Sequence, residues 1–220
     1  MIAIERRTFA GTVEFRATDG KLLAGGYAAV FNKLSQNLGG FVEQVLPGAF
    51  TKTIGEQDVR ALFNHSEDMV LGRNRSGTLR LEEDGTGLAY EIDLPDTSAG
   101  RDVAKLLERG DVSGSSFGFR TIEDEWGETP EGFPLRSLVQ TSLRDVGPVT
   151  FPAYSDSSSA LRSLAEARSL DLDALVAASA AGDLRSLIAP PEGDESTTGE
   201  EDDGREPPTA VRPRIGWMHS

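Results

Sequence analysis

The order of strand-like and helix-like segments is the feature that most constrains the fold of this chain. Over residues 1–160, short segments with β patterns follow one another, and only two helical segments interrupt them. Thr78–Glu82 and Leu88–Asp93 alternate with period two, and the Asp84-Gly85 pair between them indicates a hairpin. This mixed order lacks a regular βαβ alternation. It predicts an α+β protein, mainly an antiparallel β-barrel with helices packed around it.

The two helical segments are delimited by proline, serine and glycine. Pro47 suits the first position of a short helix that Gly55 is expected to end. Ser98 is expected to cap a second helix, which stops at Gly110. Further strands are predicted at residues 25–31, 41–46, 59–63, 112–122 and 136–146.

The composition of the chain changes after residue 157. Residues 159–188 are rich in alanine and leucine at near-helical spacing, and Gly182 is expected to divide them into two helices. Pro190–Glu206 holds eight acidic residues against one arginine, a net charge of −7 out of −14 for the whole chain. Such a segment buries too little apolar surface to fold. The predicted organisation is a domain at 1–165, a helical extension at 166–189 and a disordered acidic tail at 190–220.

Composition also excludes several classes of function. The chain has no cysteine, so it has neither disulfides nor a cysteine nucleophile, and a structural zinc site is not expected. No basic patch with interleaved aromatic residues indicates nucleic-acid binding. No apolar run reaches the length of a membrane span, and the N-terminus lacks the apolar region of a secretory signal. No cofactor, metal, nucleic acid or membrane is predicted as a partner.

One histidine and one serine carry the strongest chemical signal. Ser116 lies at the centre of Gly114-Ser115-Ser116-Phe117-Gly118, a G-x-S-x-G pattern. Serine needs a neighbouring base to act as a nucleophile, and His65 is the sole histidine outside the C-terminal segment that holds His219. An α/β-hydrolase would need a histidine after the serine and repeated βα units, so that fold is rejected. A simpler alternative for His65 is a strand-end histidine that hydrogen-bonds to a neighbour.

An acid is needed to orient the imidazole, and Asp145 is the candidate. It lies in an apolar stretch with Val146 and Val149, where a buried carboxylate requires a partner. A salt bridge to Arg144 or to another arginine is an equally weighted alternative. Glu91 and Asp93 are the next acids to consider.

Four segments, taken in order, resemble the tailed-phage prohead proteases, which are capsid-maturation serine proteases related to the herpesvirus assemblins. The resemblance covers residues 1–165, and the combination is far more specific than any one motif. The four segments are Phe41-Val42-Glu43 with Pro47-Gly48-Ala49-Phe50, Phe63-Asn64-His65 with Val70-Leu71-Gly72-Arg73, Ser113-Gly114-Ser115-Ser116-Phe117-Gly118-Phe119, and Asp145-Val146-Gly147-Pro148-Val149-Thr150-Phe151-Pro152-Ala153.

The resemblance implies that Ser116 is the nucleophile, His65 the general base and Asp145 the third member. The viral relatives use a second histidine as the third member, and this chain has none available. Gly147 stands where the family commonly has serine, and Asp145 is shorter than the glutamate often found in this block. Arg144 and Arg120 are weaker candidates for contacts to an oxyanion.

The implied function is limited proteolysis in the host cytoplasm, inside the assembling procapsid of a phage or of an integrated prophage. The expected partners are scaffold protein, major capsid protein and further copies of the chain itself. Self-cleavage is expected between residue 165 and the C-terminus. The alternative is an inactive assembly or scaffold protein with the same fold. An unrelated binding barrel would leave the four ordered motifs as coincidence.

Overall fold

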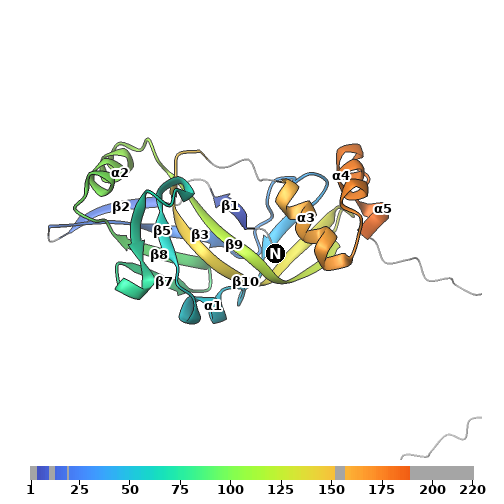
Figure 1. Cartoon of the computed structure of the whole chain (residues 1–220), viewed down its shortest axis with the longest axis horizontal. Coiled ribbons are helices and arrows are strands. Elements are labelled where there is room, and N and C mark those ends of the chain that lie inside the picture. The colour runs from blue at the N-terminus through green and yellow to red at the C-terminus, as the bar shows by residue number, and fades with distance from the viewer. Residues whose placement is uncertain (1–3, 10–12, 19, 152–156, 189–220) are drawn as a thin grey trace, which may run out of the picture. The chain divides into compact units, whose positions relative to one another are not determined.

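The structure is a computed structural model that describes residues 4–9, 13–18, 20–151 and 157–188 (Figure 1). The strands of the described part form two sheets. The first has the order β1-β9-β10-β5-β6, with β4 also paired to β10. Its strands are β1 (Glu5–Phe9), β4 (Val42–Val45), β5 (Arg60–Leu62), β6 (Val70–Arg73), β9 (Gly114–Glu128) and β10 (Pro134–Val149).

The second sheet is an antiparallel set with the order β2-β3-β8-β7. The predicted hairpin is confirmed, because β7 and β8 pair from Leu79 with Ile92 to Glu83 with Leu88. The strands of this sheet are β2 (Val13–Thr18), β3 (Lys21–Val30), β7 (Leu79–Glu83) and β8 (Gly87–Asp93).

The predicted α+β class is confirmed, but the expected antiparallel barrel is not. The described strands form two open sheets, and a one-residue bridge from Phe31 to Val45 links them. The long strand β10 explains the difference. One of its edges pairs with β9, while the other pairs in parallel with β4 near Leu135–Leu138 and with β5 at Asp145 and Val146. Because one edge of β10 pairs in parallel with two short strands, the antiparallel order does not continue beyond β10.

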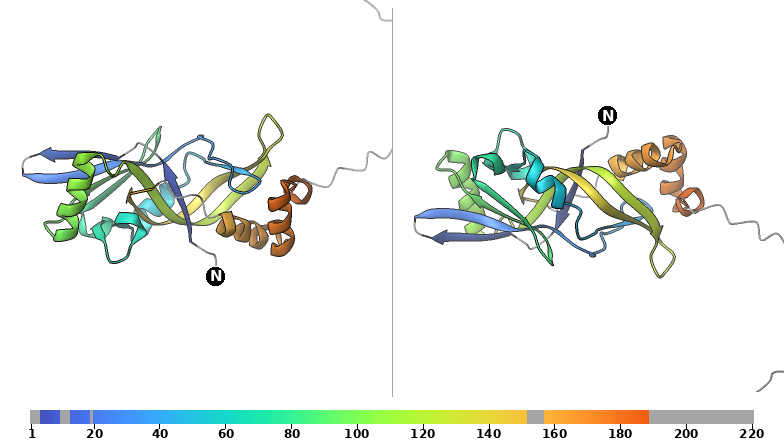
Figure 2. Two further views of the ribbon diagram at one scale, coloured as in Figure 1. Left: turned by 90° about the horizontal axis from the view of Figure 1, so that it is seen from above. Right: turned by 90° about the horizontal axis from the view of Figure 1, so that it is seen from below.

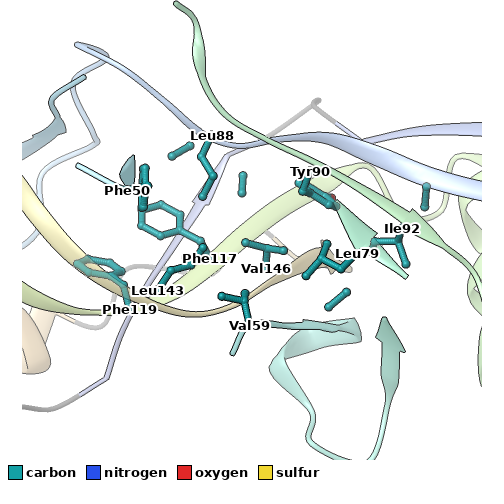
Figure 3. Packing of buried hydrophobic residues seen from close by; sticks show 14 of the residues in the cluster. Phe50, Val59, Leu79, Leu88, Tyr90, Ile92, Phe117, Phe119, Leu143 and Val146 are labelled. Carbon is teal, nitrogen blue, oxygen red and sulfur yellow. The ribbon is translucent and has the colours of Figure 1, made fainter. Parts of the chain in front are cut away.

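The main core contains side chains from both sheets and from α2. Figure 3 shows part of this cluster. Aromatic side chains of β9 are central to it. Phe117 contacts Phe119 in a stacked pair with ring centroids 4.9 Å apart, and it meets Phe50 edge-on at 5.5 Å. Offset and edge-on aromatic pairs stabilise beyond the area they bury. The strand that carries Ser116 is therefore held by its apolar face.

The helices depart in detail from the sequence expectations. α1 (Thr51–Glu56) begins four residues after Pro47, because the chain first makes a turn in which Gly48 has a φ of 95°. The helix contains Gly55 and does not end there. α2 (Ser98–Arg109) is capped by Thr97, whose side chain accepts a hydrogen bond from Gly100 N, and it ends at Gly110 as expected. Two short 3-10 turns, η1 (Phe63–His65) and η2 (Asn74–Ser76), follow β5 and β6.

Three helices follow β10 in the described part of the chain. They are α3 (Ser157–Arg168), α4 (Leu172–Ala181) and α5 (Arg185–Ile188). Gly182 ends α4 in a left-handed conformation, and a further break precedes α4, where Asp171 caps the helix. The helices pack with Leu38, Phe41 and Trp126 in a second apolar cluster beside the β9–β10 hairpin (Figure 2). The predicted boundary at 165 lies within α3, and the predicted tail at 190–220 lies outside the described residues.

Candidate active site

Ser116 lies within the regular part of β9, between two residues that face the core. Phe117 packs in the core, and Ser115 shares a hydrogen bond of 2.9 Å with the buried hydroxyl of Tyr90. Because side chains alternate along a strand, Ser116 points to the opposite face. The glycine-flanked serine is thus a strand position, consistent with the rejection of the strand-to-helix elbow of α/β-hydrolases.

His65 reaches this face through an unusual turn after β5. Asn64 and His65 both have left-handed backbones, with φ values of 51° and 56°. Asparagine tolerates this conformation better than most residues. The Asn64 side chain also binds the end of β10, since it accepts a hydrogen bond from Thr150 N at 2.8 Å and donates one to Thr150 Oγ1 at 3.0 Å. The turn is therefore fixed to the strand that supplies Asp145.

The structure brings the three predicted side chains into one line of contacts. His65 Nε2 lies 2.6 Å from Ser116 Oγ, and His65 Nδ1 contacts Asp145 Oδ2 on the other side of the ring. The His65 and Asp145 side chains are 10% and 4% exposed. An ionised carboxylate only accepts hydrogen bonds, so pairing with an ionised Asp145 requires the proton on Nδ1 and leaves Nε2 to accept one from serine. Arg144, the alternative partner of Asp145, instead pairs with Glu67 at 2.8 Å.

Two glycines leave room for this arrangement. A Cβ on Gly147 would overlap the carbonyl oxygen of Leu62, at the point where β5 leads into the histidine turn. A residue with a Cβ at this position would not fit the spacing of β5 and β10 seen here. Gly118, opposite Asp145 in the β9–β10 register, leaves the space that the Asp145 carboxylate fills.

Strand β1 contacts the serine hydroxyl. Ser116 is fully buried, with its Oγ 2.7 Å from the carbonyl oxygen of Arg7 and 3.3 Å from Thr8 Oγ1. A serine hydroxyl has one proton to donate. Two acceptors, Arg7 O and His65 Nε2, lie within reach of that proton.

A buried ionic cluster that was not predicted from the sequence holds β1 in place. Arg7 binds both carboxylate oxygens of Glu43, at 2.7 and 2.9 Å, and Arg136 binds Glu5 and Glu43 at 2.8 and 3.0 Å. Burial alone would raise the pKa of Glu5, but the attraction of Arg136 and Arg7 outweighs it and lowers the pKa to about 2. Glu43 stands at period two between Phe41 and Val45, on the apolar face of this strand, and that placement was the available signal that it needed a partner.

The other sequence candidates lie elsewhere. Glu91 and Asp93 both bind Arg80 on the second sheet. Arg120 is exposed on β9. Among the described residues, no group of three His, Cys, Asp or Glu side chains is placed to hold a metal ion, and no helix is both long and apolar enough to cross a membrane.

A serine hydroxyl, an imidazole and a carboxylate in this order are the reacting groups of the serine hydrolase class. Residues 11–170 match the family model described as caudovirus prohead serine protease, and the chain belongs to this family. The recognition of the prohead proteases from sequence is thereby confirmed.

The prohead protease of Enterobacteria phage HK97 is 32% identical over 132 residues, which are 58% of this chain and 54% of that protein. The chain therefore matches about half the length of this curated relative. Among solved structures, the capsid assembly protease of bacteriophage T4 aligns with a TM-score of 0.47 and 12% identity, over 66% of this chain and 96% of that one.

Proposed function

We propose that this protein is a serine endopeptidase of phage capsid maturation in which Ser116, His65 and Asp145 act together. The observation that carries the proposal is the continuous contact from Ser116 Oγ through both ring nitrogens of His65 to Asp145. Membership of the prohead serine protease family supports it independently.

The chemistry of the proposal is acyl transfer. Ser116 Oγ attacks the carbonyl carbon of the peptide bond while its proton passes to His65 Nε2. Asp145 holds the imidazole in the required tautomer and stabilises the imidazolium that forms. The proton then passes from His65 to the amine that leaves, and a water molecule, activated by the same nitrogen, hydrolyses the ester on Ser116.

The proposed substrates are the scaffold protein, the scaffolding part of the major capsid protein and the protease itself. The proposed place of action is the interior of the assembling procapsid in the host. Support comes from the family and from the relative in phage HK97, whose name is prohead protease. Self-association is proposed with the same support.

Labelling with a serine-directed fluorophosphonate tests the enzyme against the alternative of an inactive assembly protein. After prolonged incubation, peptide mapping by mass spectrometry should find the label on Ser116 in the wild-type chain and in Ser115→Ala. Ser116→Ala should carry no label while keeping its fold. Absence of label from the folded wild-type chain would favour the inactive assembly protein.

Self-cleavage requires an experiment in particles. When the chain is co-expressed with its capsid and scaffold proteins, intact mass spectrometry should find that the wild-type chain loses a C-terminal piece beginning after residue 165. Ser116→Ala should stay whole in the same particles. Full-length wild-type protein in matured particles would refute self-cleavage without affecting the assignment of Ser116.

A further inference from the structure

The position of β1 has a consequence for how a substrate reaches Ser116. β1 pairs antiparallel with β9 from Glu5 opposite Phe119 to Phe9 opposite Ser115, so its register spans the serine. It is the outermost strand of its sheet. An extended peptide commonly binds a protein by adding a strand to such a sheet edge, where main-chain hydrogen bonds supply the affinity.

The Ser116 hydroxyl is shielded from solvent and hydrogen-bonded to the backbone of β1. The residue is fully buried, and the Arg7 carbonyl oxygen lies 2.7 Å from Oγ. This carbonyl also competes with His65 Nε2 for the one proton of the hydroxyl. β1 therefore contributes to the burial of the serine and opposes the proton transfer on which attack depends.

From these contacts we infer that the edge of β9 at Ser115–Phe119 is the binding site for an extended peptide substrate, and that β1 occupies this site in cis as an inhibitory strand. The inference rests on the proposed function, whose substrate site it specifies. The substrate strand replaces β1, runs antiparallel to β9 and brings its own carbonyl to Ser116. The family match begins at residue 11, so the matched region excludes β1.

The ionic cluster determines how firmly the site is closed. Glu5 and Arg7 lie on β1, whereas Glu43 and Arg136 lie on β4 and β10. Displacement of β1 breaks the Arg7–Glu43 and Glu5–Arg136 pairs and leaves Arg136 bound to Glu43 and to Asp124. The part of the cluster that remains is still paired, so β1 can leave without isolating Arg136.

The test weakens the attachment of β1 without changing the net charge of the cluster. In the double variant Glu5→Gln/Arg7→Gln, the rate of fluorophosphonate labelling at Ser116 should rise roughly tenfold or more over wild type, because breaking a buried ion pair is strongly unfavourable to the closed state. The matched control is Glu14→Gln/Arg16→Gln, which removes the same pair of charges at the same spacing from exposed positions on β2. The control should label at the wild-type rate.

A binding measurement separates this inference from catalysis. A fluorescent peptide with the sequence of residues 4–9, IERRTF, should bind the double variant in a Ser116→Ala background and should not bind Ser116→Ala alone. A scrambled peptide of the same composition should bind neither protein. In the double variant with Ser116 intact, the unlabelled IERRTF peptide should return the labelling rate toward that of wild type.

The outcomes discriminate the two proposals. If the folded double variant neither labels faster nor binds the peptide, β1 is not an inhibitory strand, even where Ser116 is labelled in both proteins. If no variant is labelled but the peptide still binds the double variant alone, the peptide site stands and the protease assignment fails. If the double variant does not fold, Arg7→Lys replaces it in both measurements. This variant keeps the charge but loses the two-pronged contact with Glu43, so it should show the same effects to a smaller degree.

Discussion

Gly118 and Asp145 share one space across the β9–β10 pair. A Cβ on Gly118 would lie 2.5 Å from Asp145 Oδ1 and 3.1 Å from its Cγ, well inside contact distance. The glycine after the serine in the G-x-S-x-G pattern thus has a physical role unrelated to a nucleophile elbow. It lets the carboxylate lie against β9, from where it contacts His65 Nδ1.

Replacing Gly118 by alanine is therefore expected to displace the Asp145 carboxylate and to lower peptide turnover by about 10²-fold, the cost of a misplacement of roughly 1 Å. Gly127→Ala is the matched control, because Gly127 lies in the same strand and a Cβ there meets nothing within 4 Å. Turnover should be measured beside thermal unfolding for both variants. Equal turnover in the two would show that Gly118 does not position the carboxylate.

The role of Asp145 can be separated from a purely structural one by its amide. Asp145→Asn keeps the size of the side chain but favours the other tautomer of His65, and a change of this kind is expected to lower turnover by on the order of 10⁴. The unfolding midpoint should be measured on the same preparation. A folded Asp145→Asn with near-normal turnover would leave a pair of Ser116 and His65 alone.

Asn64 is expected to act as a positioning residue for His65. Asn64→Ala loses both hydrogen bonds to Thr150. It also places alanine, which tolerates a left-handed backbone less well than asparagine, at a φ of 51°. We expect turnover to fall by roughly 10-fold to 100-fold, because the imidazole is no longer held over Ser116. Asn64→Gly restores the backbone freedom without the hydrogen bonds, so its turnover separates the two causes. The positioning role requires both variants to lose turnover, and recovery in Asn64→Gly would assign the loss to backbone strain.

How much of this site could be foreseen depends on the range of the interactions. Ser116 and His65 could be singled out because the chain has one imidazole outside its C-terminal segment and one glycine-framed serine, and both facts are visible in the sequence. Asp145 came with an equally weighted alternative, since sequence does not show whether His65 or Arg144 faces the carboxylate. The hairpin of β7 and β8 was predictable because its turn is local.

The contacts that were missed join distant parts of the chain. Arg7 and Ser116 are 109 positions apart, and Glu5 and Arg136 are 131 apart. No local periodicity encodes which edge of β9 is taken by β1, or that β10 takes two parallel neighbours in succession. The expected barrel is not confirmed for the same reason, because strand order is set by these long-range pairings.

The stability of the β1 attachment should depend on pH through Glu5. Its pKa in the folded protein is about 2 against an ordinary value of 4.5, so the ionised form is favoured by folding. The stabilisation is fully present above pH 4.5 and is lost as the pH falls from there toward 2. A shift of this size corresponds to about 3 kcal/mol.

We expect the free energy of unfolding to decline over this window in the wild-type chain and to decline less steeply in Glu5→Gln. Glu14→Gln, which removes an exposed acid from β2, should keep the wild-type slope. Denaturant unfolding at several pH values between 6 and 3 measures all three, and the protection factors of the amides of residues 5–9, corrected for the intrinsic pH dependence of exchange, should fall over the same range if Glu5 holds β1 in place. Parallel slopes for wild type and Glu5→Gln would show that the Glu5 ion pair contributes no pH-dependent stability.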